Sequence, residues 1–334
     1  MLFLLEASMS GLETRNVPFS FSAAQELLPG IRTMGKRHKP SVKVMTREDF
    51  LADLQTHSAT FAKAVATNEG DWIIKGFIDI YQQIYTVSVD TKIVSKVLEL
   101  LLFPMFVDFA KEHSLGLELC PQQNFYPDLT FVDKQTATKY AVDIKSTYRI
   151  DDKRVNGMTL GAFTGYFRNR ESSKNTLYPY GQYSGHFVLG VIYSQTQEAL
   201  DERKRYTLDD LEKIPSVIRN FQFFAQPKYR IAAARPGSGN TKNIGSVTTI
   251  ADLVTGNGPF AQLGEEIYDD YWMYYLTKDM AQTLGVQRPY TNLKSYAEYK
   301  QRGIEAIKAH KQEIDNLTEE EEPATDQEAP EGEE

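Results

Sequence analysis

The chain has 334 residues, which is enough for one large domain or two of ordinary size. Hydrophobic residues make up 41% and aromatic residues 12%, so the composition supports a sizeable core and excludes a collagen-like, coiled-coil or mostly disordered chain. The formal charge of −8 arises at the C-terminus, because residues 313–334 hold eleven of the 45 acids and no base. The remainder has 34 acids against 37 bases, a balance that fits a nucleic-acid binder and many other enzymes.

Cysteine content and hydropathy bear on the compartment. The single cysteine, Cys120, excludes an intrachain disulfide and is typical of a reducing environment. No apolar run approaches the roughly 20 residues that span a bilayer, and the apolar start of the chain has no basic flank of the kind that precedes a signal sequence. We therefore expect a soluble, cytoplasmic protein.

The N-terminal part of the chain begins with an expected extension over residues 1–45. Six bases and no acid lie between Leu27 and Arg47, so this basic extension either contacts phosphates or forms a solvated loop. Apolar spacing then predicts a helix over residues 46–68 and a strand or strand pair over residues 72–89. A second helix is expected from Thr91, with Asp90 as its N-cap and a bend or end near Pro104.

The rest of the chain mixes strands and helices and ends in an acidic tail. Two strands, over residues 125–132 and 140–144, flank a polar turn and predict a hairpin. Further along we expect a buried strand or helical segment at 187–194, a strand at 229–234 and a helix at 293–312. The domain so defined covers residues 46–312. The tail, residues 313–334, should be disordered, either as a solubility segment or as a DNA mimic.

The predicted hairpin carries the first group of residues that suggests chemistry. Side chains alternate along a strand, so Asp143 and Lys145 share one face while Val142 and Ile144 point to the core. The hairpin would place Asp128 beside Asp143. Adjacent carboxylates repel each other unless a cation lies between them, and Mg²⁺ with substrate phosphate suits such oxygen ligands. This predicts phosphodiester hydrolysis, although the same pattern taken alone is more often a surface salt bridge.

Other candidate metal ligands are few. Glu99 is the only charged residue between Val97 and Val107, where a charge is costly unless it is paired or bound to metal. It indicates either a third acidic group at the metal site or a buried ion pair. The five histidines show no metal-ligand spacing, so we expect no zinc site.

A glycine-rich segment at residues 236–246, Pro-Gly-Ser-Gly-Asn-Thr-Lys-Asn-Ile-Gly-Ser, suggests a recognition loop. Glycine allows the backbone to approach a ligand closely, asparagine can pair with adenine in the major groove, and a threonine methyl can contact thymine. The alternative is a glycine-rich surface turn. The segment lacks the Gly-Lys-Ser/Thr spacing of a Walker loop.

Several blocks together resemble the EcoRV-like type II restriction endonucleases, within the PD-(D/E)xK nuclease superfamily. The superfamily signature is present as Pro127-Asp128, fourteen residues, and then Asp143-Ile144-Lys145. The wider match comprises residues 90–100, 122–128, 142–148, 159–161, 168–169, 178–179, 237–246 and 270–272. The resemblance extends over roughly residues 46–305.

This resemblance implies an α/β fold of the restriction-endonuclease type, with a mixed central β-sheet flanked by helices. It implies Asp128, Asp143 and Glu99 as catalytic acidic residues that bind Mg²⁺, and Lys145 as the residue that positions or activates water. The implied DNA-binding residues are Lys92, Gln123, Asn124, Tyr148, Thr164, Lys174, Gly237, Ser238, Gly239, Asn240, Thr241 and Asn243.

The resemblance also implies the overall activity and partners. The enzyme would be a homodimer that cuts double-stranded DNA at a palindrome, GATATC being the candidate, bluntly and with 5′-phosphate and 3′-hydroxyl products. A cognate DNA methyltransferase would protect host DNA. Two alternatives remain open: a repair or structure-specific nuclease with the same core, and a catalytically silent DNA-binding protein.

Overall fold

The computed structural model describes residues 45–122, 124–196, 203–237 and 242–311. The expectations for residues 1–44 and for the acidic tail therefore lie outside the described residues, as do those for Gln123 and for loop residues 238–241. Within the described ranges, no helix is both long enough and apolar enough to cross a membrane.

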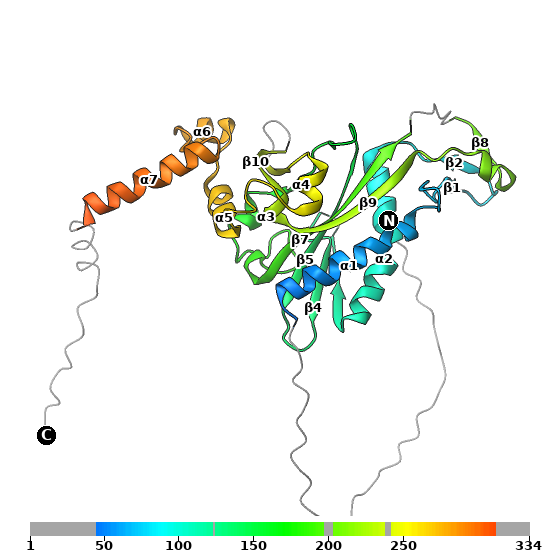
Figure 1. The fold of residues 1–334 in the computed structure, drawn as a ribbon, viewed down its shortest axis with the longest axis horizontal. Coiled ribbons are helices and arrows are strands. Elements are labelled where there is room, and N and C mark those ends of the chain that lie inside the picture. Colours follow the sequence, from blue (N-terminus) through cyan, green and yellow to red (C-terminus); the bar gives the residue numbers. More distant parts are fainter. Residues whose placement is uncertain (1–44, 123, 197–202, 238–241, 312–334) are drawn as a thin grey trace, which may run out of the picture. The chain divides into compact units, whose positions relative to one another are not determined.

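A five-stranded mixed sheet forms the centre of the fold, in the order β3-β4-β5-β7-β9 (Figure 1). Its strands are β3 (Leu115–Glu118), β4 (Leu129–Asp133), β5 (Lys139–Tyr148), β7 (Tyr183–Gln195) and β9 (Ile218–Pro227). The antiparallel pair β4 and β5 confirms the predicted hairpin, whereas β5 and β7 run parallel. The apolar run at 187–194 lies within β7 and is buried on both faces, which is typical of a central strand.

Two helices, α1 (Arg47–Val65) and α2 (Thr91–Glu112), pack on one face of this sheet (Figure 1). As predicted, Asp90 caps α2, its carboxylate accepting hydrogen bonds from two backbone N–H groups of the first turn. Of the bend or end predicted near Pro104, the end is wrong, because α2 continues to Glu112. Proline inside a helix costs about 3 kcal/mol, but apolar residues on both sides of Pro104 are buried in the same core and offset this cost.

The opposite side of the central sheet carries a second core and a second sheet, of order β10-β11-β6. Its strands are β6 (Thr159–Ala162), β10 (Ala232–Pro236) and β11 (Asn243–Ser246). The helices here are α3 (Lys228–Ile231), α4 (Ile250–Thr255), α5 (Glu265–Tyr274), α6 (Lys278–Leu284) and α7 (Leu293–Ala309). The strand predicted at 229–234 is wrong in its first half, because the chain leaves β9 at Pro227 and makes the helical turn α3 before β10 begins.

A third, smaller sheet joins β1 (Gly76–Ile78), β2 (Ile84–Thr86) and β8 (Arg205–Tyr206) in the order β1-β2-β8. β1 and β2 confirm the strand pair predicted within residues 72–89. Three short 3₁₀ helices complete the described structure: η1 (Gly165–Phe167), η2 (Tyr180–Gln182) and η3 (Leu208–Lys213). The architecture is thus α/β, with a mixed central sheet flanked by helices, as expected.

Candidate active site

The register of the β4–β5 hairpin brings Asp128 and Asp143 together. Leu129 pairs with Val142, so Asp128, just before β4, lies next to Asp143 on β5. The Ile144 N–H donates to Oδ2 of Asp128 at 2.7 Å, and the Asp128 N–H lies 3.4 Å from Oδ1 of Asp143. Asp143 is almost completely buried, whereas Asp128 is half-buried. The predicted pairing of the two carboxylates is therefore present.

Lys145 contacts both carboxylates from the same face of β5. Its Nζ lies 3.4 Å from Oδ2 of Asp128 and 3.5 Å from Oδ2 of Asp143. Burial acts to lower the pKa of Lys145, but the two carboxylates outweigh it and hold the pKa above its ordinary value, so the ammonium form is favoured. Burial is also the largest influence on Asp128, and it raises the pKa of that carboxyl against the opposing effect of Lys145. The three side chains form one electrostatic unit, rather than a salt bridge at the surface.

A second lysine, Lys228, lies behind Asp143 and was not predicted from the sequence. It is only 2% exposed, and its Nζ lies 3.9 Å from Oδ2 of Asp143 and 4.3 Å from the ring centre of Tyr126. Burial lowers the pKa of Lys228 to about 8, while Asp143 opposes that change. Two lysine side chains, Lys145 and Lys228, thus approach Oδ2 of Asp143. The only sequence signal was a lysine directly after Pro227, next to an apolar strand.

Glu99 lies on α2 and does not contact the two aspartates. Its carboxylate pairs with Nζ of Lys96 at 2.7 Å. The ion pair expected as the alternative to a metal ligand is therefore present, although Glu99 is only half-buried. The charge of Glu99 nevertheless contributes to the raised pKa of Asp128. Beside it, Oγ of Ser95 lies 2.6 Å from Oγ of Ser146, which ties α2 to β5 one residue after Lys145. Glu99 therefore acts on the site electrostatically from α2, a neighbouring element.

The base of the predicted recognition loop is formed by β10 and β11. The Gly237 N–H donates to the Asn243 carbonyl at 2.9 Å, and Asn243 pairs with Ala162 of β6. A Cβ atom on Gly245 would lie 2.9 Å from Cα of Gly237, so the two strands approach too closely for a side chain at that position. The structure thus anchors both ends of the loop, whereas Ser238, Gly239, Asn240 and Thr241 lie outside the described residues.

The other predicted DNA contacts are dispersed. Lys92, Asn124 and Lys174 are exposed, and Thr164 is half-buried just before η1. Tyr148, at the end of β5, packs against the core beneath α1 and α2, which is the face of the strand opposite Asp143. Gln123 is not described.

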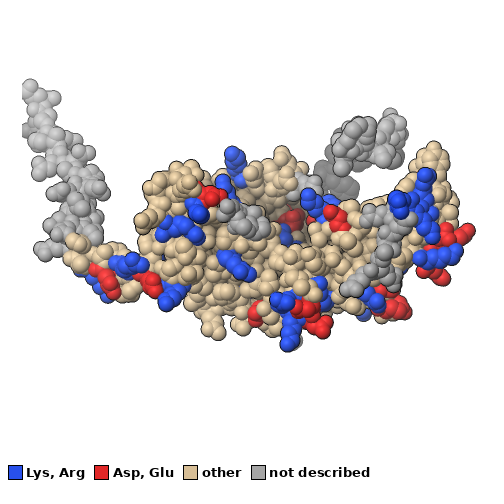
Figure 2. All heavy atoms as spheres, turned by 90° about the horizontal axis from the view of Figure 1, so that it is seen from above, with Lys and Arg blue, Asp and Glu red and all other residues tan. Residues whose placement is uncertain are grey.

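One face of the molecule is uneven. Seen from above, it is hollowed between two raised parts, and acidic and basic side chains lie within the hollow (Figure 2).

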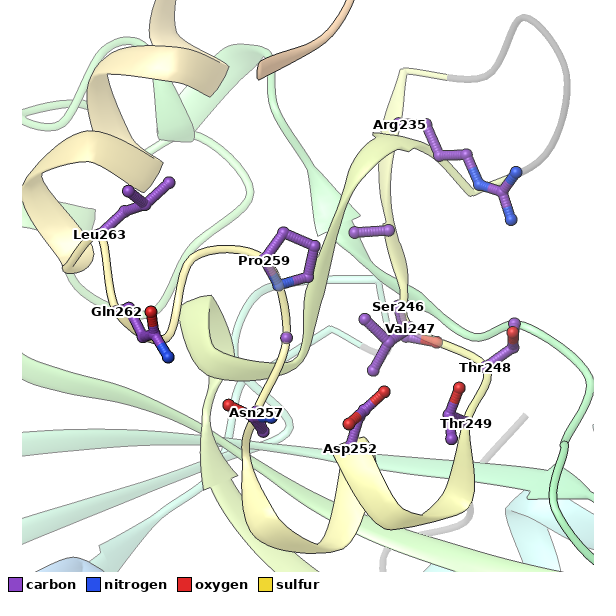
Figure 3. A pocket seen from close by; sticks show the side chains of 12 residues that line it. Arg235, Ser246, Val247, Thr248, Thr249, Asp252, Asn257, Pro259, Gln262 and Leu263 are labelled. Carbon is purple, nitrogen blue, oxygen red and sulfur yellow. The ribbon is translucent and has the colours of Figure 1, made fainter. Parts of the chain in front are cut away.

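A separate pocket of about 620 Å³ lies beside β10 and β11 and is lined by residues that include Arg235, Ser246, Thr249 and Asp252 (Figure 3). Neither Asp128 nor Asp143 lines this pocket, so it is distinct from the carboxylate–lysine group.

Comparison with known proteins identifies the family. The family model described as Restriction endonuclease EcoRV matches residues 68–301. The chain is 36% identical over 202 residues to the type II restriction enzyme EcoRV of Escherichia coli, which covers 60% of this chain and 81% of that enzyme. The NlaIV restriction endonuclease structure aligns over 76% of this chain and 96% of its own, at 9% identity and a TM-score of 0.34, too weak a similarity to bear on the fold. On the strength of the family match, the chain belongs to the EcoRV family of restriction endonucleases and is a type II site-specific deoxyribonuclease.

Proposed function

We propose that this endonuclease cleaves a palindromic site in double-stranded DNA in a Mg²⁺-dependent reaction centred on Asp128, Asp143 and Lys145. The observation that carries the proposal is the convergence of the Lys145 Nζ, at 3.4 and 3.5 Å, on the two carboxylates. A cation is already required there to offset two adjacent negative charges. Phosphodiester hydrolysis likewise needs positive charge close to the phosphate, to stabilise the negative charge that develops on it.

The donor set fits a hard divalent cation. Carboxylate oxygens are the protein ligands that Mg²⁺ prefers, and the two aspartates present them on adjacent strands. We propose that Asp128 and Asp143 hold Mg²⁺, with Glu99 as the additional acid from α2. When bound, the metal would polarise a phosphoryl oxygen and stabilise developing charge.

The remaining roles in the reaction belong to a backbone N–H group and two lysines. The Ile144 N–H fixes the Asp128 carboxylate, so that this ligand is held in place before substrate arrives. Lys145, with a raised pKa, is a hydrogen-bond donor toward a phosphate oxygen or the attacking water. Lys228 lies on the buried side of Asp143 and supports its negative charge from within the core. The products should carry 5′-phosphate and 3′-hydroxyl ends.

Plasmid cleavage followed by sequencing of the ends tests this function. With Mg²⁺ we expect blunt cuts in the centre of GATATC, part of the specificity arising from the easily deformed central TA step. Cuts at another fixed sequence would retain the enzyme class and refute the site. Cleavage only of branched or damaged DNA would favour the repair-nuclease alternative. Specific binding without cleavage would favour the silent DNA-binding protein.

Asn240 is the residue in the proposed recognition loop with the largest expected effect on sequence readout. Asn240→Ala should lower specific cleavage by roughly 5- to 160-fold, which corresponds to about 1–3 kcal/mol for a lost base contact. The measurement is the ratio of cleavage rates on GATATC and on sites with one altered base pair. Lys242→Ala, at the exposed foot of the same loop, serves as the neighbouring comparison. Wild-type discrimination by Asn240→Ala would show that the loop does not read bases through this residue.

We also propose that the enzyme is a homodimer that associates through the small sheet. The β1–β2 surface, defined here as Phe77, Ile78, Ile80 and Tyr81, exposes large apolar side chains, with Ile80 at 89% and Tyr81 at 78%. Such side chains in one hairpin are costly in water unless a partner covers them. A two-fold dimer would match a palindromic site, with each subunit reading one half.

The double change Ile78→Asp with Ile80→Asp should convert the dimer to a monomer. Like charges placed on a self-complementary apolar interface repel across the two-fold axis and remove apolar burial. Sedimentation velocity at micromolar concentration measures the change in mass. Leu284→Asp, on α6, introduces a charge at a similarly exposed leucine and should leave the dimer intact. A dimer that persists in the double variant would place the interface elsewhere.

A nuclease of this kind in the cytoplasm would also attack the DNA of its own cell. We therefore propose a cognate DNA methyltransferase that modifies the same site as its functional partner. Methylated and unmethylated copies of one plasmid should then differ in cleavage, with the methylated copy resistant.

A further inference from the structure

A cluster of histidines and carboxylates lies where the end of α2 meets the middle of α1. His57 comes from α1, Glu112 is the last residue of α2, and His113 follows it as the C-cap. One potential ligand atom from each of these three residues lies within 4.8 Å of the other two. From the structure we propose that His57, Glu112 and His113 form a second metal site, separate from the catalytic carboxylates, that takes a transition-metal ion such as Zn²⁺.

The distances within the cluster suit a small tetrahedral ion. Nε2 of His57 lies 3.3 Å from Oε2 of Glu112. Two ligands at about 2.0–2.1 Å from a tetrahedral Zn²⁺ are roughly 3.3–3.4 Å apart. This pair therefore already has the separation of two ligands of one ion. Two imidazoles with one carboxylate leave a fourth position for water, which is a common zinc arrangement.

The surroundings hold the two imidazole rings in place. The Phe109 ring packs against both, with its centre 5.2 Å from that of His57 and 4.6 Å from that of His113, and the centres of the two imidazoles are 6.1 Å apart. Oδ2 of Asp53 lies 3.0 Å from Nδ1 of His113, and Asp53 precedes His57 by one turn of α1. A carboxylate that holds an imidazole is the usual support of a metal-binding histidine. The rings are half-buried and the cluster is open to solvent through Glu112, so an ion can enter.

The chemistry of the cluster separates it from the catalytic site. Imidazole nitrogen favours Zn²⁺ and related ions, whereas Mg²⁺ prefers the oxygen-only set of Asp128 and Asp143. Glu99, whose charge acts on Asp128, lies thirteen residues before Glu112 on α2, or roughly 20 Å along the helix axis. A metal at this end of α2 would join α1 to α2, the two helices that support the central sheet. Its expected effect is on stability, without direct contact with the substrate.

Zinc binding to the full-length protein tests this proposal independently of cleavage. The chelator-treated protein is titrated with Zn²⁺ against a chromophoric chelator in excess Mg²⁺, and Tm is measured with and without Zn²⁺. We expect one Zn²⁺ per chain and a higher Tm with the metal. Glu112→Gln changes an exposed side chain, so it should keep the fold while weakening Zn²⁺ at least about tenfold. The double change His57→Ala with His113→Ala should abolish this binding.

Two further variants locate the ion. His310→Ala removes a histidine at the end of α7 and should bind Zn²⁺ as the wild type does. Asp143→Asn alters the catalytic site and should also retain the Zn²⁺. Undiminished affinity in Glu112→Gln and in the double histidine variant would overturn the proposal, as would loss of the ion in Asp143→Asn alone. Absence of binding by the wild type at micromolar Zn²⁺ would leave only two His–carboxylate ion pairs at this position and would overturn it equally.

Discussion

Asp143→Asn should reduce plasmid cleavage at saturating Mg²⁺ by about 1000-fold or more. The amide keeps the size of the carboxylate, and its oxygen can still accept from the Asp128 N–H, so the hairpin should be preserved. What is lost is one of two negative charges that converge on Lys145 and, in the proposed reaction, on the metal. Single-turnover rates on supercoiled plasmid, at several Mg²⁺ concentrations, measure the effect.

The matched control for this variant is Asp108→Asn, an exposed aspartate on α2 that pairs only loosely with Lys111, at 3.7 Å. It makes the same chemical change without touching the carboxylate–lysine group and should cleave at the wild-type rate. Circular dichroism and thermal unfolding should show both variants folded. If Asp143→Asn cuts within about tenfold of the wild-type rate, then Asp143 is not a ligand on which the reaction depends.

The part of the site predicted from sequence is the part that local structure determines. Asp128, Asp143 and Lys145 belong to one hairpin, and the alternation of a strand together with a short turn is enough to bring them together. The position of Lys228 depends instead on β9 lying beside β7 and on the turn α3 after it. Those pairings are long-range, and no periodicity in the sequence reports them.

The wrongly predicted helix end has the same origin. Pro104 is a strong local signal for a helix end, but burial of Leu102 and Phe106 in the common core outweighs it. The histidines showed no ligand spacing because His57 and His113 lie on different helices, and only the packing of α1 on α2 brings them together. Local propensity therefore identified the elements, whereas tertiary packing determined where some of them end and which side chains meet.

Lys145→Met should separate the two functions of the site, which are cleavage of DNA and binding of Mg²⁺. Methionine keeps an unbranched apolar side chain of similar length but has no charge, so cleavage should fall by about 100- to 1000-fold, as when one hydrogen-bond donor to a developing charge is removed. Affinity for Mg²⁺ should be unchanged or higher, because the Lys145 Nζ lies 3.4 and 3.5 Å from the same carboxylate oxygens and competes with any cation there. Asp143→Asn should do the reverse for metal affinity and weaken it at least about tenfold, since it removes a ligand charge.

Calorimetric titration of Mg²⁺ into each variant, beside cleavage rates across Mg²⁺ concentration, distinguishes these outcomes. A Lys145→Met protein whose activity returns at high Mg²⁺ would show that the lysine serves only to hold the two aspartates. A Lys145→Met protein that binds Mg²⁺ more weakly than the wild type would contradict the competition between Nζ and the metal. Loss of cleavage with metal affinity retained would assign Lys145 to the reaction itself, because its ammonium group would then act on phosphate or water and not on the assembly of the site.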